Sequence, residues 1–225
     1  MIERKKTMKA KKVLLVAIIA LLATGCTKHT IVADRTLKVG NIYCSDGSVM
    51  DPDTYKSEGR DNAAGVIFWV NDTLDTEDKA YIVSLSNARK NIWCDSLVST
   101  GVSTSIDQYD GAANTAMLQT FEVRTSAKAP AMEIAVNFSE GIANWHLPSV
   151  KELMEIYRNK AVIKYALQAC DGEGFDKVWY WSSTEDNSGE QSKQFNAYIV
   201  SLKEGRIQAS HKFDSYHVRP VKAIK

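Results

Sequence analysis

The first 26 residues constrain this chain most, because they decide where the rest of it folds. Six of the first twelve residues are basic, and an unbroken apolar run of eleven residues follows at 13–23. That run is too short to span a bilayer, which needs about 20 apolar residues. A basic segment, a short apolar segment and then small residues, here Ala23-Thr24-Gly25, are typical of a signal peptide. We therefore expect residues 1–25 to be removed and the remainder to fold outside the cytoplasm.

Cys26 directly follows these small residues, at the position that is lipid-modified in bacterial lipoproteins. Such signals usually carry Leu, Val or Ile three residues before the cysteine, whereas this chain has Ala23 there and Leu22 one step earlier. The alternatives are an ordinary secretory signal with an incidental cysteine and an uncleaved membrane anchor. We expect lipidation of Cys26. This predicts an outer-membrane lipoprotein of the cell envelope, on its periplasmic face or on the cell surface.

Removal of the signal changes the charge of the chain. Basic residues fall from 28 to 22 and acidic residues from 27 to 26, so the mature chain carries −4 instead of +1. A nucleic-acid-binding surface needs a clustered basic patch, and none is visible here, so we expect no nucleic-acid partner. The 200 mature residues are enough to bury a sizeable core.

Three cysteines remain after Cys26, and an oxidising envelope permits disulfides. Cys170 falls on an apolar helical stripe, which predicts a buried, inert thiol. Cys44 and Cys94 are the candidate pair. The chain contains no Cys-x-x-Cys, which argues against a zinc or redox site.

The pattern of the mature chain predicts a polar tether at 26–38 and a single folded domain at 39–224. Its first part, 39–113, is rich in strands and loops, with a hairpin formed by 64–70 and 80–85. Its second part, 114–224, begins with helices around Met117–Phe121 and Met132–Val136. Ser149 and Glu152 form a capping-box pattern that opens a further helix, and another helix ends near Cys170. Strands are then expected at 178–183, 197–202, 206–210 and 218–224.

Three segments carry a family resemblance: Asn144-Trp-His-Leu-Pro-Ser-Val-Lys-Glu-Leu153, Tyr180-Trp-Ser-Ser-Thr-Glu185 and Val218-Arg-Pro-Val221. In this order they resemble the Fibrobacter succinogenes major paralogous domain, which is related to the Lcl C-terminal domain. Asp46-Gly47, Gly65–Phe68 and Asp110–Thr115 resemble the long form of this family in Bacteroidota lipoproteins. The resemblance covers about residues 39–224. It implies a C-type-lectin-like α+β fold with irregular loops, here with an N-terminal β-hairpin extension.

By analogy the family implies recognition outside the cell membrane, so we expect a non-catalytic role in binding or adhesion, with a glycan or an envelope or extracellular protein as ligand. The alternatives are a structural envelope lipoprotein without a small-molecule ligand and an enzyme resembling sulfatase-modifying factors. We expect the ligand-binding surface in the loops 171–177 and 185–194, where one of Trp179 and Trp181 could stack on a sugar ring. The candidate residues there are Asp171, Glu173, Asp176, Trp181, Glu185, Asp186 and Glu190. Arg219 is expected to pair with Glu152 or Glu185.

Calcium and catalysis are both disfavoured by the sequence. The acidic loop residues could hold calcium, but the Glu-Pro-Asn, Gln-Pro-Asp and Trp-Asn-Asp signatures of sugar-binding C-type lectins are missing. A sulfatase-modifying enzyme needs reactive cysteines or a metal site, and Cys170 on an apolar face is a poor candidate. His211 and His217 could meet across strands but have no clear third metal ligand. We expect no catalytic residues, no metal and no required cofactor.

Overall fold

The computed structural model describes residues 33–73, 77–175 and 179–225. The chain divides into two units, Met1–Val32 and Ala33–Lys225, and the second is described here. The signal peptide, Cys26 and the first part of the tether lie outside the described residues. In the described part of the chain, no helix is long and apolar enough to cross a membrane.

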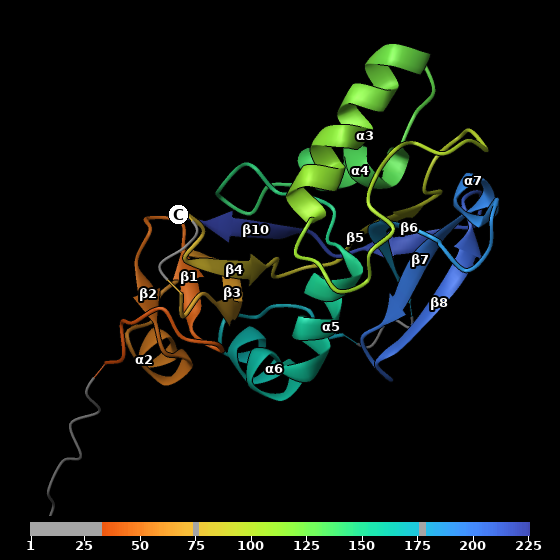
Figure 1. Cartoon of the computed structure of the whole chain (residues 1–225). Helices are drawn as coiled ribbons and strands as arrows, with labels where there is room; N and C mark the ends of the chain where they lie inside the picture. Colours follow the sequence, from red (N-terminus) through yellow and green to blue (C-terminus); the bar gives the residue numbers. More distant parts are fainter. Residues whose placement is uncertain (1–32, 74–76, 176–178) are drawn as a thin grey trace, which may run out of the picture. The chain divides into compact units, whose positions relative to one another are not determined.

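The first sheet joins the beginning of the domain to its end (Figure 1). Its strand order is β10-β4-β3-β1-β2, and every neighbouring pair is antiparallel. The predicted hairpin is formed by β3 and β4, and the C-terminal strand extends it, with Val221 opposite Val83. The hairpin is therefore an integral part of the domain. The strands are β1 (Ile42–Cys44), β2 (Val49–Met50), β3 (Ala63–Val70), β4 (Ala80–Val83) and β10 (Val221–Ile224).

The second sheet holds most of the C-terminal strands, in the order β5-β9-β6-β7-β8. All of its pairs are antiparallel except β6 with β9. The single strand expected at 218–224 is divided by Pro220, which lacks an N–H, so that β9 belongs to this sheet and β10 to the first. The strands are β5 (Ala88–Asn91), β6 (Tyr180–Glu185), β7 (Asn196–Ser201), β8 (Arg206–His211) and β9 (Tyr216–Val218).

The helices begin where the sequence provides caps. The predicted capping box is complete: the Ser149 side chain accepts from the backbone N–H of Glu152, and Glu152 accepts from that of Ser149. Pro130 occupies the first turn of its helix, as expected. Two short helices, α2 and α7, were not predicted. The helices are α2 (Pro52–Ser57), α3 (Gly111–Thr125), α4 (Pro130–Val136), α5 (Val150–Arg158), α6 (Lys160–Ala169) and α7 (Ser192–Phe195). Together with the two sheets they form an α+β fold.

The described residues form three apolar cores, two large and one small. The first lies where α5 and α6 pack on the first sheet, and includes Phe68, Leu153 and Leu167. The second lies where α3 and α4 meet the second sheet, and includes Phe121 and Trp181.

The cysteines do not form the expected disulfide. Cys44 and Cys94 are both free and buried, and they pack in different cores, Cys44 in the first and Cys94 in the second. The Cys44–Cys94 pairing is therefore wrong. Cys170 is half-buried, and burial raises the pKa of its thiol to about 11, which agrees with an inert cysteine.

The tether, expected to extend from residue 26 to residue 38, ends before residue 34. The backbone N–H of Asp34 donates to Asp51 Oδ2 at 3.0 Å, and Leu37 packs on a small apolar cluster that includes Trp145. Residues 34–38 thus contact the folded unit, because Asp51 offers an acceptor to the incoming chain.

Candidate binding site

The predicted loop surface is not assembled as one site. The described residues 171–175 of the first loop precede β6, and the second loop begins at Glu185, the last residue of β6. The two loops therefore join opposite ends of a six-residue strand, which is about 17–20 Å long. Asp171 and Glu190 are exposed, while Glu173 accepts hydrogen bonds from the Asn87 backbone and side chain at 3.0 and 2.6 Å. Asp176 lies outside the described residues. The candidate residues therefore do not converge on one ligand.

Three of the predicted ligand residues are buried and have structural partners. Trp181 is fully buried, and its indole N–H donates to the Asn91 carbonyl at 2.9 Å. Glu185 is fully buried and lies 2.6 Å from Lys212 Nζ. Burial alone would raise the pKa of Asp186. Hydrogen bonds from Ser188 and other donors more than offset burial, so the pKa of Asp186 is lowered. The placement of Trp181, Glu185 and Asp186 on a ligand-binding surface is contradicted, because their polar atoms serve the fold.

The other tryptophan is partly exposed, whereas the buried arginine differs from expectation. Trp179 is only half-buried, with the Arg206 guanidinium 5.8 Å from its ring centroid. Arg219 pairs with neither Glu152 nor Glu185. Its guanidinium donates to the carbonyls of Leu85 and Glu173 and to Asn87 Oδ1.

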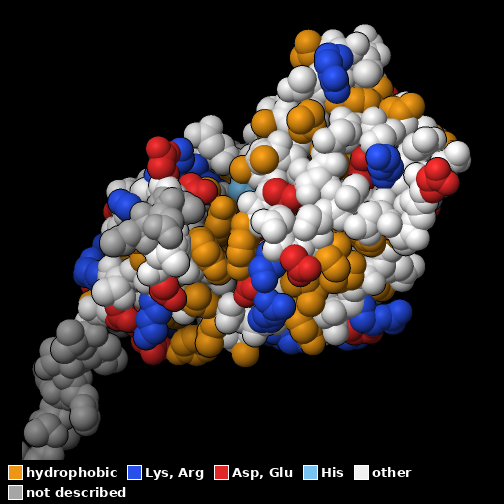
Figure 2. Space-filling view, viewed as in Figure 1, with side chains coloured by type: hydrophobic (Ala, Val, Ile, Leu, Met, Phe, Trp, Pro, Cys, Tyr) orange, Lys and Arg blue, Asp and Glu red, His pale blue; other side chains and the backbone are white. Residues whose placement is uncertain are grey.

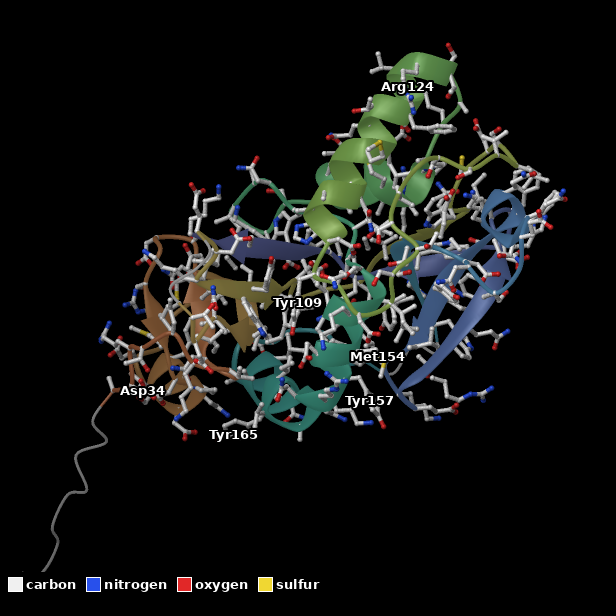
Figure 3. The ribbon with its side chains drawn as sticks, in the orientation of Figure 1. Asp34, Tyr109, Arg124, Met154, Tyr157 and Tyr165 are labelled. Carbon is white, nitrogen blue, oxygen red and sulfur yellow. The ribbon has the colours of Figure 1, made fainter. Side chains whose placement is uncertain are left out.

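The structure instead assembles three aromatic side chains that sequence reasoning missed, and we call them the aromatic triad: Trp69, Tyr81 and Tyr109. The Tyr81 and Tyr109 rings are stacked with centroids 5.8 Å apart and an interplanar angle of 8°. Trp69 is tilted against both, at 5.1 Å from Tyr81 and 4.9 Å from Tyr109. Tyr81 is buried, whereas Trp69 and Tyr109 are partly exposed. Figure 3 labels Tyr109, and Figure 2 shows a hydrophobic patch at the same place in the same orientation.

A β-bulge brings Trp69 into this arrangement. Ile67 faces Ile82 and Trp69 faces Tyr81, so one residue, Phe68, is extra on β3. Regular alternation would place Phe68 and Trp69 on opposite faces, but both pack against the first core. Tyr109 arrives from the loop before α3, so no sequence periodicity connects it to the two strand residues.

Polar groups surround the exposed ring of Tyr109. Lys151 Nζ lies 5.4 Å from its centroid and 3.2 Å from Glu155 Oε1. Burial and then the charge of Glu155 raise the pKa of the Tyr109 phenol. Burial and the charge of Glu152 do the same for Tyr81. Both phenols therefore keep their protons at neutral pH, and each proton has a carboxylate partner: Asp78 for Tyr81, at 3.1 Å, and Glu155 for Tyr109.

A histidine–carboxylate pair lies beside the triad. The His146 ring meets Tyr81 edge-on with centroids 6.4 Å apart, and its Nε2 is 3.3 Å from Glu152 Oε2. The same oxygen accepts from the Ser149 backbone at 2.9 Å, whereas Glu152 Oε1 is buried without a hydrogen-bond partner among the described residues. Gly111 packs against this carboxylate so closely that a Cβ there would overlap Glu152 Oε2.

His146 also forms the floor of two adjoining pockets of about 380 and 330 Å³, which share Ala112 and Asn144. The larger pocket is further lined by Tyr43, Lys222, Ala223, Ile224 and Lys225. Ala223 is the strand partner of Tyr81, so this pocket and the triad lie side by side. A concave surface with apolar walls and a few polar groups is the usual form of a ligand site.

The family-like segment around His146 connects the two sheets. His146 pairs with Val221 of the first sheet through hydrogen bonds of 2.8 and 3.2 Å, and Pro148 accepts from Ser183 of the second at 2.7 Å. Trp145 and Leu147 are buried in apolar clusters. The segment thus shapes the floor of the pocket while holding the domain together.

Among the described residues, the hydrogen-bond and ring partners of His146 are Glu152, Tyr81 and Val221, and none of these is a Ser, Thr or Cys nucleophile. Likewise, the described residues contain no group of three or more His, Cys, Asp or Glu side chains arranged to hold a metal ion.

Comparison with known proteins agrees with the resemblance seen in the sequence. No curated protein matches the chain. The Lcl C-terminal domain family matches residues 92–222, a range that contains Tyr109, His146 and Glu152 but not Trp69 and Tyr81. That match covers more than half of the sequence, and the chain belongs to the Lcl C-terminal domain family.

Proposed function

We propose that this chain is a lipid-anchored protein of the cell envelope that binds a glycan or a protein ligand without catalysis. The single observation that carries the binding proposal is the partly exposed aromatic triad beside the pocket above His146.

The chemistry of the triad favours a glycan. A sugar ring presents an apolar C–H face that packs on an aromatic face, and its rim of hydroxyls needs hydrogen-bond partners. Trp69 and Tyr109 offer the partly exposed rings, while Lys151 and Glu155 offer a donor and an acceptor at the edge of Tyr109. This binding would need no cofactor and no calcium, because side chains supply the recognition.

The anchoring proposal depends on the sequence alone. The basic segment, the short apolar run and Cys26 support export and lipidation, as in lipoproteins of the Bacteroidota. We place the protein in the outer membrane, on either face, with the membrane as its partner through the lipid.

A structural lipoprotein without a small-molecule ligand is the second candidate. One observation favours it: Trp145, Leu147, Ser149 and Glu152 of the family-like segment are all buried and engaged in packing or capping.

A glycan array tests the binding proposal. Residues 27–225, expressed without the signal, would be applied with and without calcium, alongside a Trp69→Ala variant of matched thermal stability. We expect calcium-independent hits that the variant loses. If the variant retains the hits, the triad is not the binding site. An array without hits would favour the structural lipoprotein.

Acyl labelling of the full precursor tests the anchor. Cys26→Ala should abolish incorporation of labelled fatty acid, and Cys170→Ala should leave it unchanged. Unchanged labelling or membrane association in Cys26→Ala would defeat the lipid anchor.

A further inference from the structure

A second pocket, away from the triad, is lined by three lysines. Lys160 and Lys164 of α6 and Lys203 of the turn after β7 surround Phe175 and Leu202, enclosing about 270 Å³. Lys160 Nζ donates to the Lys203 carbonyl at 2.8 Å and lies 4.3 Å from the Tyr157 ring centroid. These contacts fix the Lys160 ammonium beside Lys203, and all three lysines line one pocket with Phe175 and Leu202.

The positive charge of this pocket is uncompensated within its described surroundings. None of its described lining residues is acidic, and the ion pairs recorded between described residues include none of the three lysines. The mature chain as a whole carries −4. The local field therefore opposes the overall charge and favours an anionic partner at this place.

Exposed apolar side chains accompany the lysines on the same helix. Val162 is 48% and Tyr165 53% exposed. Val162 nevertheless lies about 160° around the helix from both Lys160 and Lys164. Tyr165 is bonded to Asp53 in the first turn of α2, so the lysines alone share one surface. We call Lys160, Lys164 and Lys203 the α6 surface.

The α6 surface lies near the point where the chain enters the folded unit. Asp34 is bonded to Asp51, the N-cap of α2, and the Tyr165 hydroxyl donates to Asp53 in the first turn of that helix. Figure 3 shows Asp34, Tyr165 and Tyr157 along the same margin. Ala33 follows Cys26 by seven residues, and seven residues reach at most about 25 Å. A lipid on Cys26 would therefore hold this part of the domain close to the bilayer.

We propose that the α6 surface rests on the headgroups of anionic phospholipids, with the three lysines contacting phosphate. This inference depends on the proposed lipid anchor. The lipid supplies attachment, and the α6 surface fixes which side of the domain faces the membrane.

Amine labelling of the lipidated protein in vesicles tests this orientation. The mature protein would be reconstituted into vesicles of phosphatidylcholine alone or mixed with phosphatidylglycerol, and the modification of each lysine followed by mass spectrometry. Labelling of Lys164 and Lys203 should fall several-fold in the anionic vesicles and recover in high salt. Lys128, which follows α3, and Lys193 of α7 serve as internal controls, because α3 and α7 lie at the margin opposite α6 in Figure 1.

A charge-reversal pair provides the matched control. Lys164→Glu with Lys203→Glu should abolish the protection of Lys160, whereas Lys128→Glu with Lys193→Glu should preserve it. Vesicle flotation separates the two proposals. Protein that floats with both vesicle types but shows equal labelling of all lysines overturns the α6 surface alone. Protein that does not float defeats the anchor, and this inference falls with it.

Discussion

Lys212 and Glu185 form a fully buried ion pair, with Nζ 2.6 Å from Oε1. The same ammonium donates to the carbonyls of Val98 and Lys193, at 2.7 and 2.8 Å. Glu185 also accepts from the backbone N–H of Thr100 at 2.8 Å. The pair therefore ties the loop around residues 98–100 and helix α7 to the end of β6.

Removal of one partner of this pair should be costly. Lys212→Met leaves the Glu185 carboxylate buried without its cation, and we expect a loss of about 3–5 kcal/mol in the free energy of unfolding. The double variant Lys212→Met with Glu185→Leu should recover part of that loss, because no charge remains buried although the Thr100 N–H and two carbonyls lose their partners. Urea denaturation measures both. A single variant within about 0.5 kcal/mol of wild type would contradict a buried, dry pair.

Gly111 should not tolerate a side chain. A Cβ at this position would overlap Glu152 Oε2 and lie 2.9 Å from both His146 Cδ2 and the Ser149 backbone nitrogen. Gly111→Ala should therefore lower stability by about 1–3 kcal/mol, despite the better helix propensity of alanine. Gly189→Ala is the matched control, since its Cβ would meet only Ser192 Cβ, at 3.9 Å. Equal thermal midpoints for the two variants would refute this close packing.

Asp110 gives the protein a distinctive pH dependence. Burial is the main cause that raises the pKa of this carboxyl, and the charge of Glu152 adds to it. The folded state thus holds the proton more tightly than the unfolded state, and the contribution of Asp110 to stability falls as the pH rises through its folded pKa.

Asp110→Asn should become progressively more stable than wild type as the pH rises from the acidic range to neutrality. The difference in urea midpoint between the two proteins, measured across that range, isolates this group from other carboxyls. Asp46→Asn is the control. Its urea midpoint relative to wild type should change with pH in the opposite direction, because hydrogen bonds from Ser48 lower the pKa of Asp46. If the difference in urea midpoint between Asp110→Asn and wild type does not change with pH, Asp110 is not buried beside Glu152.

The three cysteines of the folded unit should be slow to react while the protein is folded. Burial raises the pKa of each thiol, and for Cys170 to about 11, so little thiolate exists at neutral pH. A thiol reagent should modify all three cysteines only after unfolding in denaturant. The protein should also be purified from an oxidising compartment and its thiols counted after unfolding. A count of one thiol instead of three would support the Cys44–Cys94 disulfide after all.

Local signals in the sequence predicted much of the fold. The capping box at Ser149 and Glu152 and the hairpin of β3 and β4 are encoded within a few residues, and both are confirmed. The pairing of β10 with β4 joins segments about 140 residues apart and has no local signal. Pro220 did signal an interruption, but its consequence, strands in two different sheets, depends on the tertiary fold.

The candidate site was harder to predict for the same reason. Acidic residues near turns suggested exposed ligands, but Glu185 is neutralised by Lys212, which is distant in sequence. The aromatic triad combines a β-bulge at Phe68 with a loop residue, Tyr109, so no periodicity marks it. A cluster of Trp and Tyr at the ends of β3 and β4 was the available signal.

Calorimetric titration with the strongest array hit tests most directly whether the aromatic triad binds a glycan. Trp69→Ala and Tyr109→Ala should each weaken the affinity by about tenfold or more, as expected for aromatic residues at the centre of a binding site. Tyr165→Ala, which removes an exposed tyrosine outside the site, should leave the affinity unchanged. Equal affinities for wild type and all three variants, in folded proteins, would contradict the account.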